Sequence, residues 1–131
     1  MQTRVFQLKL RILNRGKAHR LETMQHAFTD AVRLHLDTAY MLPKPSVSSL
    51  HAACYHAARD RFPLPASIIQ QARDKALAIY RGIQTRKRQG KKTSRPRLQR
   101  PLPLRIAVEN LRVFPEKQMA RLTTPNGFLW L

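Results

Sequence analysis

The sequence has one cysteine and no long apolar run, and each shortage excludes a class of protein. Cys54 stands alone among 131 residues, so no intramolecular disulfide can form and a disulfide-stapled secreted domain is excluded. No stretch approaches the roughly 20 apolar residues of a membrane span. Near the N-terminus, Gln7, Lys9 and Arg11 interrupt the apolar residues, unlike in a signal peptide. We therefore expect a cytoplasmic protein, nucleoid-associated when bound, that does not contact membranes.

Acidic residues are also scarce, which speaks against a metal-dependent active site within this chain. The seven Asp and Glu residues are scattered, and Asp30 and Asp37 lie two helical turns apart, too far to share a metal ion. No C-x-x-C pair is present for zinc. No histidine stands four residues from another, the spacing that places two imidazoles on one metal. We predict no catalytic residue, no metal ligand and no cofactor in this chain.

Positive charge is abundant and indicates the class of partner. Lys and Arg total 25, which gives a formal net charge of +18. Self-repulsion of this size destabilises a compact state unless an anionic partner offsets it, and phosphate polymers are the commonest such partner. Hydrophobic residues make up 43% of the chain, so its composition is that of a folded protein. The length suits one compact domain or two small lobes.

Hydrophobic periodicity predicts a strand followed by three helices. Apolar and polar residues alternate over residues 6–12, as in a half-buried strand. Apolar residues then recur at three- and four-residue steps over residues 17–42, which predicts a long helix that Pro43 ends. Serines beyond that proline can cap a second, shorter helix. Pro65 suits a position at or near the first turn of a third helix, which should end near Gly90.

Short alternating runs in the C-terminal part predict further strands. They cover residues 104–109, 111–114, 118–123 and 127–131, and Asn-Gly at 126–127 is a strong hairpin signal. The simplest arrangement is an α+β fold, in which the first strand joins the later ones in a small antiparallel barrel or sheet. The three helices would then be an insertion between the first and second strands.

The segment between the helices and the strands is strongly basic. Residues 82–105 hold nine Lys or Arg and no acid, and no acid occurs between Asp74 and Glu109. A charge run that serves only solubility normally mixes signs, so we favour contact with phosphates. Predicted structure on both sides makes the segment a connector and not a tail. Its candidate phosphate contacts are Arg86, Lys87, Arg88, Lys91, Lys92, Arg95, Arg97 and Arg100.

Three sequence features in order resemble a known family. They are PASIIQQA at residues 65–72, then GKK at residues 90–92, then RPRL at residues 95–98. Together with the order of strand, helices and strands, they resemble the N-terminal region of the transposon-encoded TnpB (OrfB) proteins. These are RNA-guided DNA endonucleases related to the type V CRISPR effectors. The likeness extends over essentially the whole chain.

The resemblance implies an organisation and a set of contacts. Residues 1–14 would be the first strand of an oligonucleotide-binding-like (OB-like) wedge barrel, residues 15–92 a helical recognition lobe, and residues 93–131 the basic connector and remaining wedge strands. Together they would grip a guide RNA–target DNA hybrid and a short flanking DNA motif. Gln70 would read that motif, with Ser67 one turn earlier.

Three further residues complete the predicted interface. We place Arg73 with Gln70 as a nucleic-acid contact. Tyr40 and Tyr55 lie off the inferred apolar helix faces and are candidates for stacking on a base. The spacing of Phe114, Phe128 and Trp130 instead predicts core positions. The chain departs from the family ahead of Gln70. The family often has a basic or aromatic residue there, whereas this chain has alanine and serine.

The family continues into a RuvC-like nuclease domain and a zinc-binding insertion, and this sequence ends first. We therefore expect a truncated product or one piece of a split protein, with Mg²⁺ needed only by the missing nuclease domain. The implied partners are a guide RNA, target DNA and, for a split protein, a separate nuclease-domain chain. Two alternatives stay open: part of a complete RuvC-type endonuclease, or an independent small basic DNA- or RNA-binding structural protein.

Overall fold

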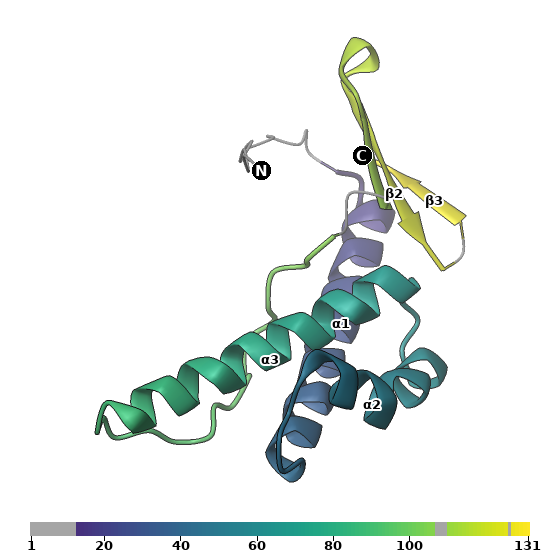
Figure 1. The fold of residues 1–131 in the computed structure, drawn as a ribbon. Helices are drawn as coiled ribbons and strands as arrows, with labels where there is room; N and C mark the ends of the chain where they lie inside the picture. The colour runs from purple at the N-terminus through teal and green to yellow at the C-terminus, as the bar shows by residue number, and fades with distance from the viewer. Residues whose placement is uncertain (1–12, 107–109, 126) are drawn as a thin grey trace.

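Three helices and a small sheet make up the computed structural model, which describes residues 13–106, 110–125 and 127–131 (Figure 1). The helices are α1 (Arg15–Met41), α2 (Val47–Arg61) and α3 (Ala66–Arg88). The strands are β1 (Leu111–Phe114), β2 (Met119–Thr124) and β3 (Gly127–Trp130), and a short 3₁₀ turn, Pro115–Lys117, joins the first two. The expected α+β class is confirmed.

The sheet is antiparallel and open among the residues that the structure describes. Its order is β1-β2-β3, with Leu111 opposite Leu122 and Leu122 opposite Leu129. A closed barrel is not shown. The expected first strand at residues 6–12 lies outside the described residues, so an insertion of the helices between two strands has no support here. The expected strand at 104–109 is irregular over residues 104–106, and the rest of it also lies outside.

The first helix follows the predicted period closely. Asn14 caps its start, because its side chain accepts a hydrogen bond from the backbone N–H of Lys17 at 2.9 Å. Its buried apolar face recurs every four residues at Phe28, Val32 and Leu36. The helix ends one residue before Leu42, ahead of the proline that stops it.

The second and third helices differ in how they begin. Ser46 and Ser49 form a reciprocal capping box at the start of α2. The start of α3 has Pro65 at the cap position, directly before the first turn, and no side-chain cap. On α2, Leu50 and Cys54 are buried, while alanines 53 and 57 are exposed. A narrow stripe at four-residue steps suffices because α2 is short.

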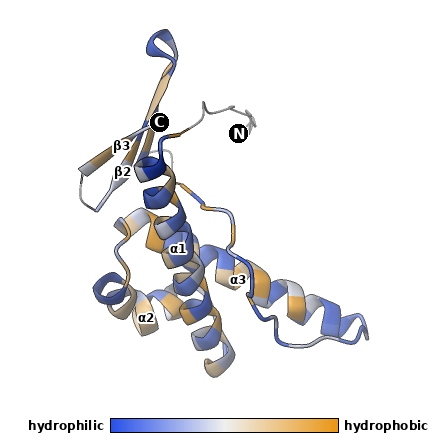
Figure 2. Ribbon diagram, turned by 180° about the vertical axis from the view of Figure 1, so that it is seen from behind, coloured by the Kyte–Doolittle hydropathy of each residue, from blue (hydrophilic) through white to orange (hydrophobic). Residues whose placement is uncertain are grey.

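The core joins the helices to one face of the sheet. Leu122 and Leu129 are buried in the same cluster as Phe28 of α1 and Ile69 of α3. A side-chain hydrogen bond from Arg20 of α1 to a β2 threonine, at 3.1 Å, adds a polar link. The sheet therefore rests on the N-terminal part of α1. In Figure 2 the far end of α3 and the turn after it are hydrophilic, in contrast to this apolar centre.

Candidate nucleic-acid interface

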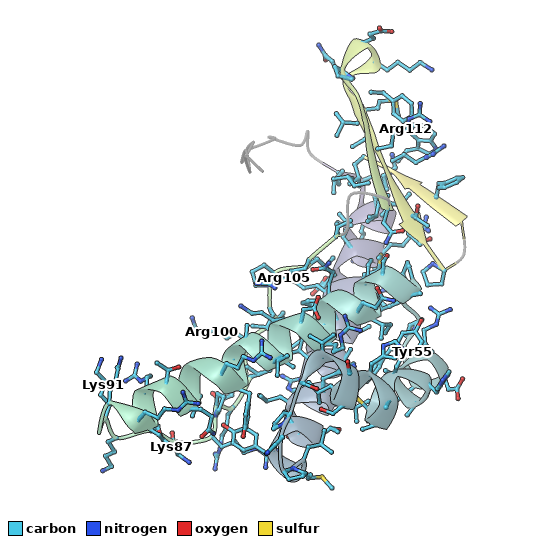
Figure 3. The ribbon with its side chains drawn as sticks, in the orientation of Figure 1. Tyr55, Lys87, Lys91, Arg100, Arg105 and Arg112 are labelled. Carbon is cyan, nitrogen blue, oxygen red and sulfur yellow. The ribbon has the colours of Figure 1, made fainter. Side chains whose placement is uncertain are left out.

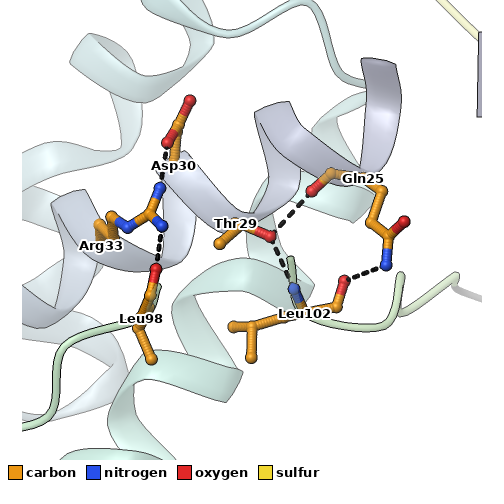
Figure 4. Close-up of polar contacts among 6 residues, drawn as sticks. All are labelled: Gln25, Thr29, Asp30, Arg33, Leu98 and Leu102. Atoms are coloured by element: carbon orange, nitrogen blue, oxygen red, sulfur yellow. Dashed lines mark hydrogen bonds and ion pairs between the residues drawn. The ribbon is translucent and has the colours of Figure 1, made fainter. Parts of the chain in front are cut away.

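The chain after α3 runs back along α1 and is fixed there by hydrogen bonds (Figure 4). The Gln25 side-chain amide donates to the Leu102 carbonyl at 3.0 Å, and the Leu102 N–H donates to the Thr29 hydroxyl at 2.9 Å. The same hydroxyl donates to the backbone carbonyl of Gln25 at 2.9 Å. Thr29 is buried, so its hydroxyl satisfies two backbone groups that water reaches poorly.

A second set of polar contacts holds the connector closer to the end of α1. Arg33 pairs with Asp30 at 2.5 Å and donates to the carbonyl of Leu98. One helical turn further, Asp37 forms an ion pair with Arg95. The α1 residues at 25, 29, 33 and 37 are four apart and so line one face of the helix. The connector crosses that face in the opposite direction, since residues 95, 98 and 102 meet α1 in descending order.

Apolar contacts accompany these hydrogen bonds. Leu98, Leu102, Leu104 and Ile106 are partly buried against the main core. The connector's alternation of leucines with prolines thus has a structural reason: leucines face the helices while Pro101 and Pro103 are exposed. Residues 95–106 are therefore an anchored segment of the folded body.

The end of α3 and the first part of the connector form what we call the basic arm, residues 81–100, which projects as far as residue 94 and is anchored to α1 over residues 95–100. In Figures 1 and 2, α3 extends past the other helices, and the chain turns at its end and returns. Gly90 has a φ of 75°, the left-handed conformation common just after a helix. The arm contains nine Lys or Arg and no acid: Arg81, Arg86, Lys87, Arg88, Lys91, Lys92, Arg95, Arg97 and Arg100.

Most of these cations are free to meet a ligand. All nine are exposed, and among the described residues only Arg95 has an acidic partner. Figure 3 shows Lys87 and Lys91 extending from the tip of the arm. Three of the cations lie in the last turn of α3, where the negative end of the helix dipole stabilises them. Between the arm and α1 is an open hollow of about 600 Å³, lined by α1 and by residues 95–99.

Arg95 and Tyr40 form one unit. The Arg95 guanidinium lies 4.7 Å from the centre of the Tyr40 ring, and Tyr80 contacts that ring edge-on at 5.2 Å between centroids. The Tyr40 hydroxyl is buried and has no hydrogen-bond partner within the described part of the chain. Arg95 is thus held by both Asp37 and Tyr40, which leaves it less available to a phosphate than Arg97.

Tyr40 and Tyr55 lie on the core-facing sides of their helices, so the expectation that they lie off the apolar faces was wrong. Both Tyr40 and Tyr55 are partly buried against the main core. Tyr55 stacks on His51 with ring centroids 4.2 Å apart and planes 18° apart. The error arose because α1 and α2 are flanked by α3 and the connector, which widens the covered face beyond the stripe that the sequence indicates. A role in base stacking stays a prediction for both.

The residues expected at the start of α3 lie far from the arm. About 24 Å of helix separates Gln70 from Arg86, so the structure divides the predicted contacts into two places. Ser67 accepts a hydrogen bond from the side-chain amide of Asn110, which joins α3 to the start of the sheet. Gln70 is partly buried. Within the described part of the chain, its side chain has no hydrogen-bond partner.

Arg73 is an internal link between two helices. Its side chain is 12% exposed and donates to Asp74 at 3.0 Å. It also contacts the Nδ1 atom of His51 on α2 at 3.0 Å. These bonds use the guanidinium within the protein, so the structure favours a role in joining α2 and α3 over the predicted nucleic-acid contact.

Two buried titratable groups lie near this link. Burial lowers the pKa of His35, whose Nδ1 bonds the Ala31 carbonyl at 2.8 Å. Burial also raises the pKa of the Cys54 thiol, which disfavours the reactive thiolate. In residues 13–106, 110–125 and 127–131, no group of three or more His, Cys, Asp or Glu is placed to hold a metal ion. No helix of that same region is long and apolar enough to cross a membrane.

The aromatic residues of the sheet were placed wrongly by sequence spacing. Phe128 is 53% exposed and Trp130 is 37% exposed, and Phe114 is only partly buried. The alternation Phe-Leu-Trp indicated a strand but not which set faces inward. In the structure, Leu129 is the buried member. The arginines at 112 and 121, which share the outer face, could have been found from the same alternation once the register was known.

Comparison with known proteins adds no relative: no family model, curated protein or solved structure matches the chain.

Proposed function

We propose that the chain is a nucleic-acid-binding module that grips the phosphate backbone of a duplex with its basic arm. The observation that carries the proposal is the arm itself: nine cations without an acid, presented by a helix end and a connector that is tied along α1. Ordered cations lose less conformational entropy on binding than a disordered cationic tail would. The net charge of +18 gives the same surface long-range attraction for polyanions.

The resemblance to TnpB proteins supports a more specific ligand, a guide RNA–target DNA hybrid. In that proposal the arm reads helical shape, base pairing supplies sequence selection, and Gln70 reads a short flanking motif. Residues 1–14 would add a strand to the sheet and complete an OB-like wedge. A RuvC-like domain that uses Mg²⁺ would come from another part of the assembly, either the same protein or a separate chain.

Salt dependence of binding tests the arm. Affinity for an RNA–DNA hybrid is measured over a series of salt concentrations for the unaltered chain and for Lys91→Gln/Lys92→Gln. Each lost phosphate contact should reduce the slope of log K against log salt by about 0.9, so the double variant should lose about 2. The matched control is Lys44→Gln/Lys117→Gln, which removes two exposed lysines outside the arm.

The control is expected to keep the slope of the unaltered chain. Equal losses for the two double variants would refute the arm as the binding element. A second comparison concerns shape: the chain should bind the hybrid more tightly than heparin of similar charge. Equal affinity for both would indicate a generic polyanion binder, as for the independent basic protein considered above.

A further inference from the structure

The outer face of the sheet presents arginines and aromatic rings together. Arg112, Arg121 and Trp130 lie directly opposite one another on β1, β2 and β3, so their side chains are on the same face. Since side chains alternate along a strand, Phe114 and Phe128 join that face. Figure 3 shows Arg112 on the sheet, far from Lys91 at the tip of the basic arm.

These side chains contact one another closely. The Arg121 guanidinium lies 4.1 Å from the centre of the Phe128 ring and 5.8 Å from that of Trp130. Arg112 lies 5.0 Å from the Phe114 ring centre, and the Phe114 and Trp130 rings are 5.5 Å apart. The result is a connected cluster of aromatic rings and planar guanidinium groups, which we call the aromatic face.

The aromatic face is open, whereas the opposite face of the sheet is buried at Leu122 and Leu129. Leu122 and Leu129 on the inner face are at most 2% exposed, whereas Phe128 is 53% exposed. Adjacent exposed aromatic residues on a small protein commonly mark a binding surface. Arg112 and Arg121 lie within the aromatic face, and no Asp or Glu lies on β1, β2 or β3, so its charge suits an anionic ligand. Its aromatic rings suit a ligand with planar groups.

We propose that the aromatic face binds a single-stranded segment of nucleic acid, with bases stacked on Phe128 and Trp130 and phosphates contacted by Arg112 and Arg121. Unpaired bases stack on aromatic rings and on guanidinium planes whatever their sequence. The inference rests on the proposed function only in that the ligand is a nucleic acid. It uses a different surface and a different interaction from the phosphate contacts of the basic arm.

The chain carries its own reporter for this contact, because Trp130 is its one tryptophan. Tryptophan fluorescence is followed while a short oligothymidine is added to the full chain. Stacking of a base on the indole should quench the emission. An abasic oligonucleotide of the same length is the control ligand, since it offers the phosphates without bases and should leave the emission nearly unchanged.

Substitution on the face tests the affinity. Phe128→Ala should weaken oligothymidine binding about tenfold, as expected for loss of one stacked base. The matched control is Val113→Ala, which removes a partly exposed apolar side chain from the opposite face of the same sheet and should leave affinity unchanged. Thermal unfolding verifies that both variants are folded.

The outcomes separate this inference from the proposed function. Lys91→Gln/Lys92→Gln should weaken duplex binding but leave the quenching at saturation intact. Equal quenching by the abasic strand, or unchanged affinity in a folded Phe128→Ala variant, would overturn the aromatic face as a base-binding surface. So would sedimentation showing a dimer that Phe128→Ala dissociates, because the face would then be a contact between two copies.

Discussion

Thr29 is the residue whose substitution tests most directly whether the connector is part of the folded body. Thr29→Val keeps the size and the β-branched shape of the side chain and removes only the hydroxyl. Helix propensity hardly changes, since threonine and valine rank together. The substitution removes two hydrogen bonds of this hydroxyl, the one it accepts from the Leu102 N–H and the one it donates to the Gln25 carbonyl, each at 2.9 Å.

The expected loss of stability follows from what remains unpaired. Thr29 is 2% exposed, so water reaches the vacated position poorly and the Leu102 N–H stays unsatisfied. Leaving a buried donor without a partner costs about 1–3 kcal/mol. For a chain of this size, each kcal/mol lowers the melting temperature by about 4 °C. The matched control is Thr85→Val, whose exposed hydroxyl bonds only the Arg81 carbonyl, and its cost should stay within about 0.5 kcal/mol.

Urea unfolding followed by far-UV circular dichroism measures the free energy of unfolding of both variants. Amide hydrogen exchange at Leu102 gives an independent local reading, because loss of the hydroxyl should speed exchange there before the rest of the chain is affected. If Thr29→Val is as stable as Thr85→Val and the Leu102 amide is equally protected in both, the connector is not held as described here.

Three further predictions concern buried groups. Burial lowers the pKa of His35 below its ordinary value of 6.5, and the charged groups near it are Arg73, Asp74 and His51. On acidification, His35 is therefore protonated at a higher pH in the unfolded chain than in the folded one. Stability should therefore fall as the pH drops below 6.5, by at most about 1.4 kcal/mol per pH unit from this group. Urea titrations at several pH values should show a weaker pH dependence of stability for His35→Gln. An unchanged dependence would contradict the role given to His35. Arg73→Ala should lower the free energy of unfolding by about 1–3 kcal/mol and leave hybrid affinity unchanged, whereas lost affinity at full stability would restore the sequence-based role. Leu122→Ala, at a fully buried position, should cost about 2–5 kcal/mol in the same assay, and a loss below about 1 kcal/mol would place the sheet outside the core.

The helices were predictable because their signals are local. The four-residue recurrence of Phe28, Val32 and Leu36 fixes the buried face of α1, and Pro43 fixes where it stops. The basic character of the arm was also evident from residues 82–105 alone. What the sequence could not give was the path of the connector, because the contact of Leu102 with Thr29 joins positions 73 residues apart.

The candidate sites were harder to predict than the helices, for a related reason. Arg73 has the charge of a phosphate contact, and only the position of α2 reveals that His51 already binds it. The aromatic face depends on strand register: Arg121 opposite Trp130 cannot be deduced from either strand alone. The polar residues at four-residue steps on α1 would ordinarily indicate a solvent-facing stripe, so they gave no sign that the connector lies there.

The geometry of the basic arm lets its length change without rebuilding the body. Hydrogen bonds to α1 begin at Arg95, and residues 89–94 form the turn at the tip of the arm. None of residues 89–94 packs against the hydrophobic core. Inserting four residues into the end of α3 would advance the tip by about 6 Å. About two extra residues in the extended return path would match that advance. Paired insertions of this kind would change how far the arm reaches from the body while every buried side chain keeps its neighbours.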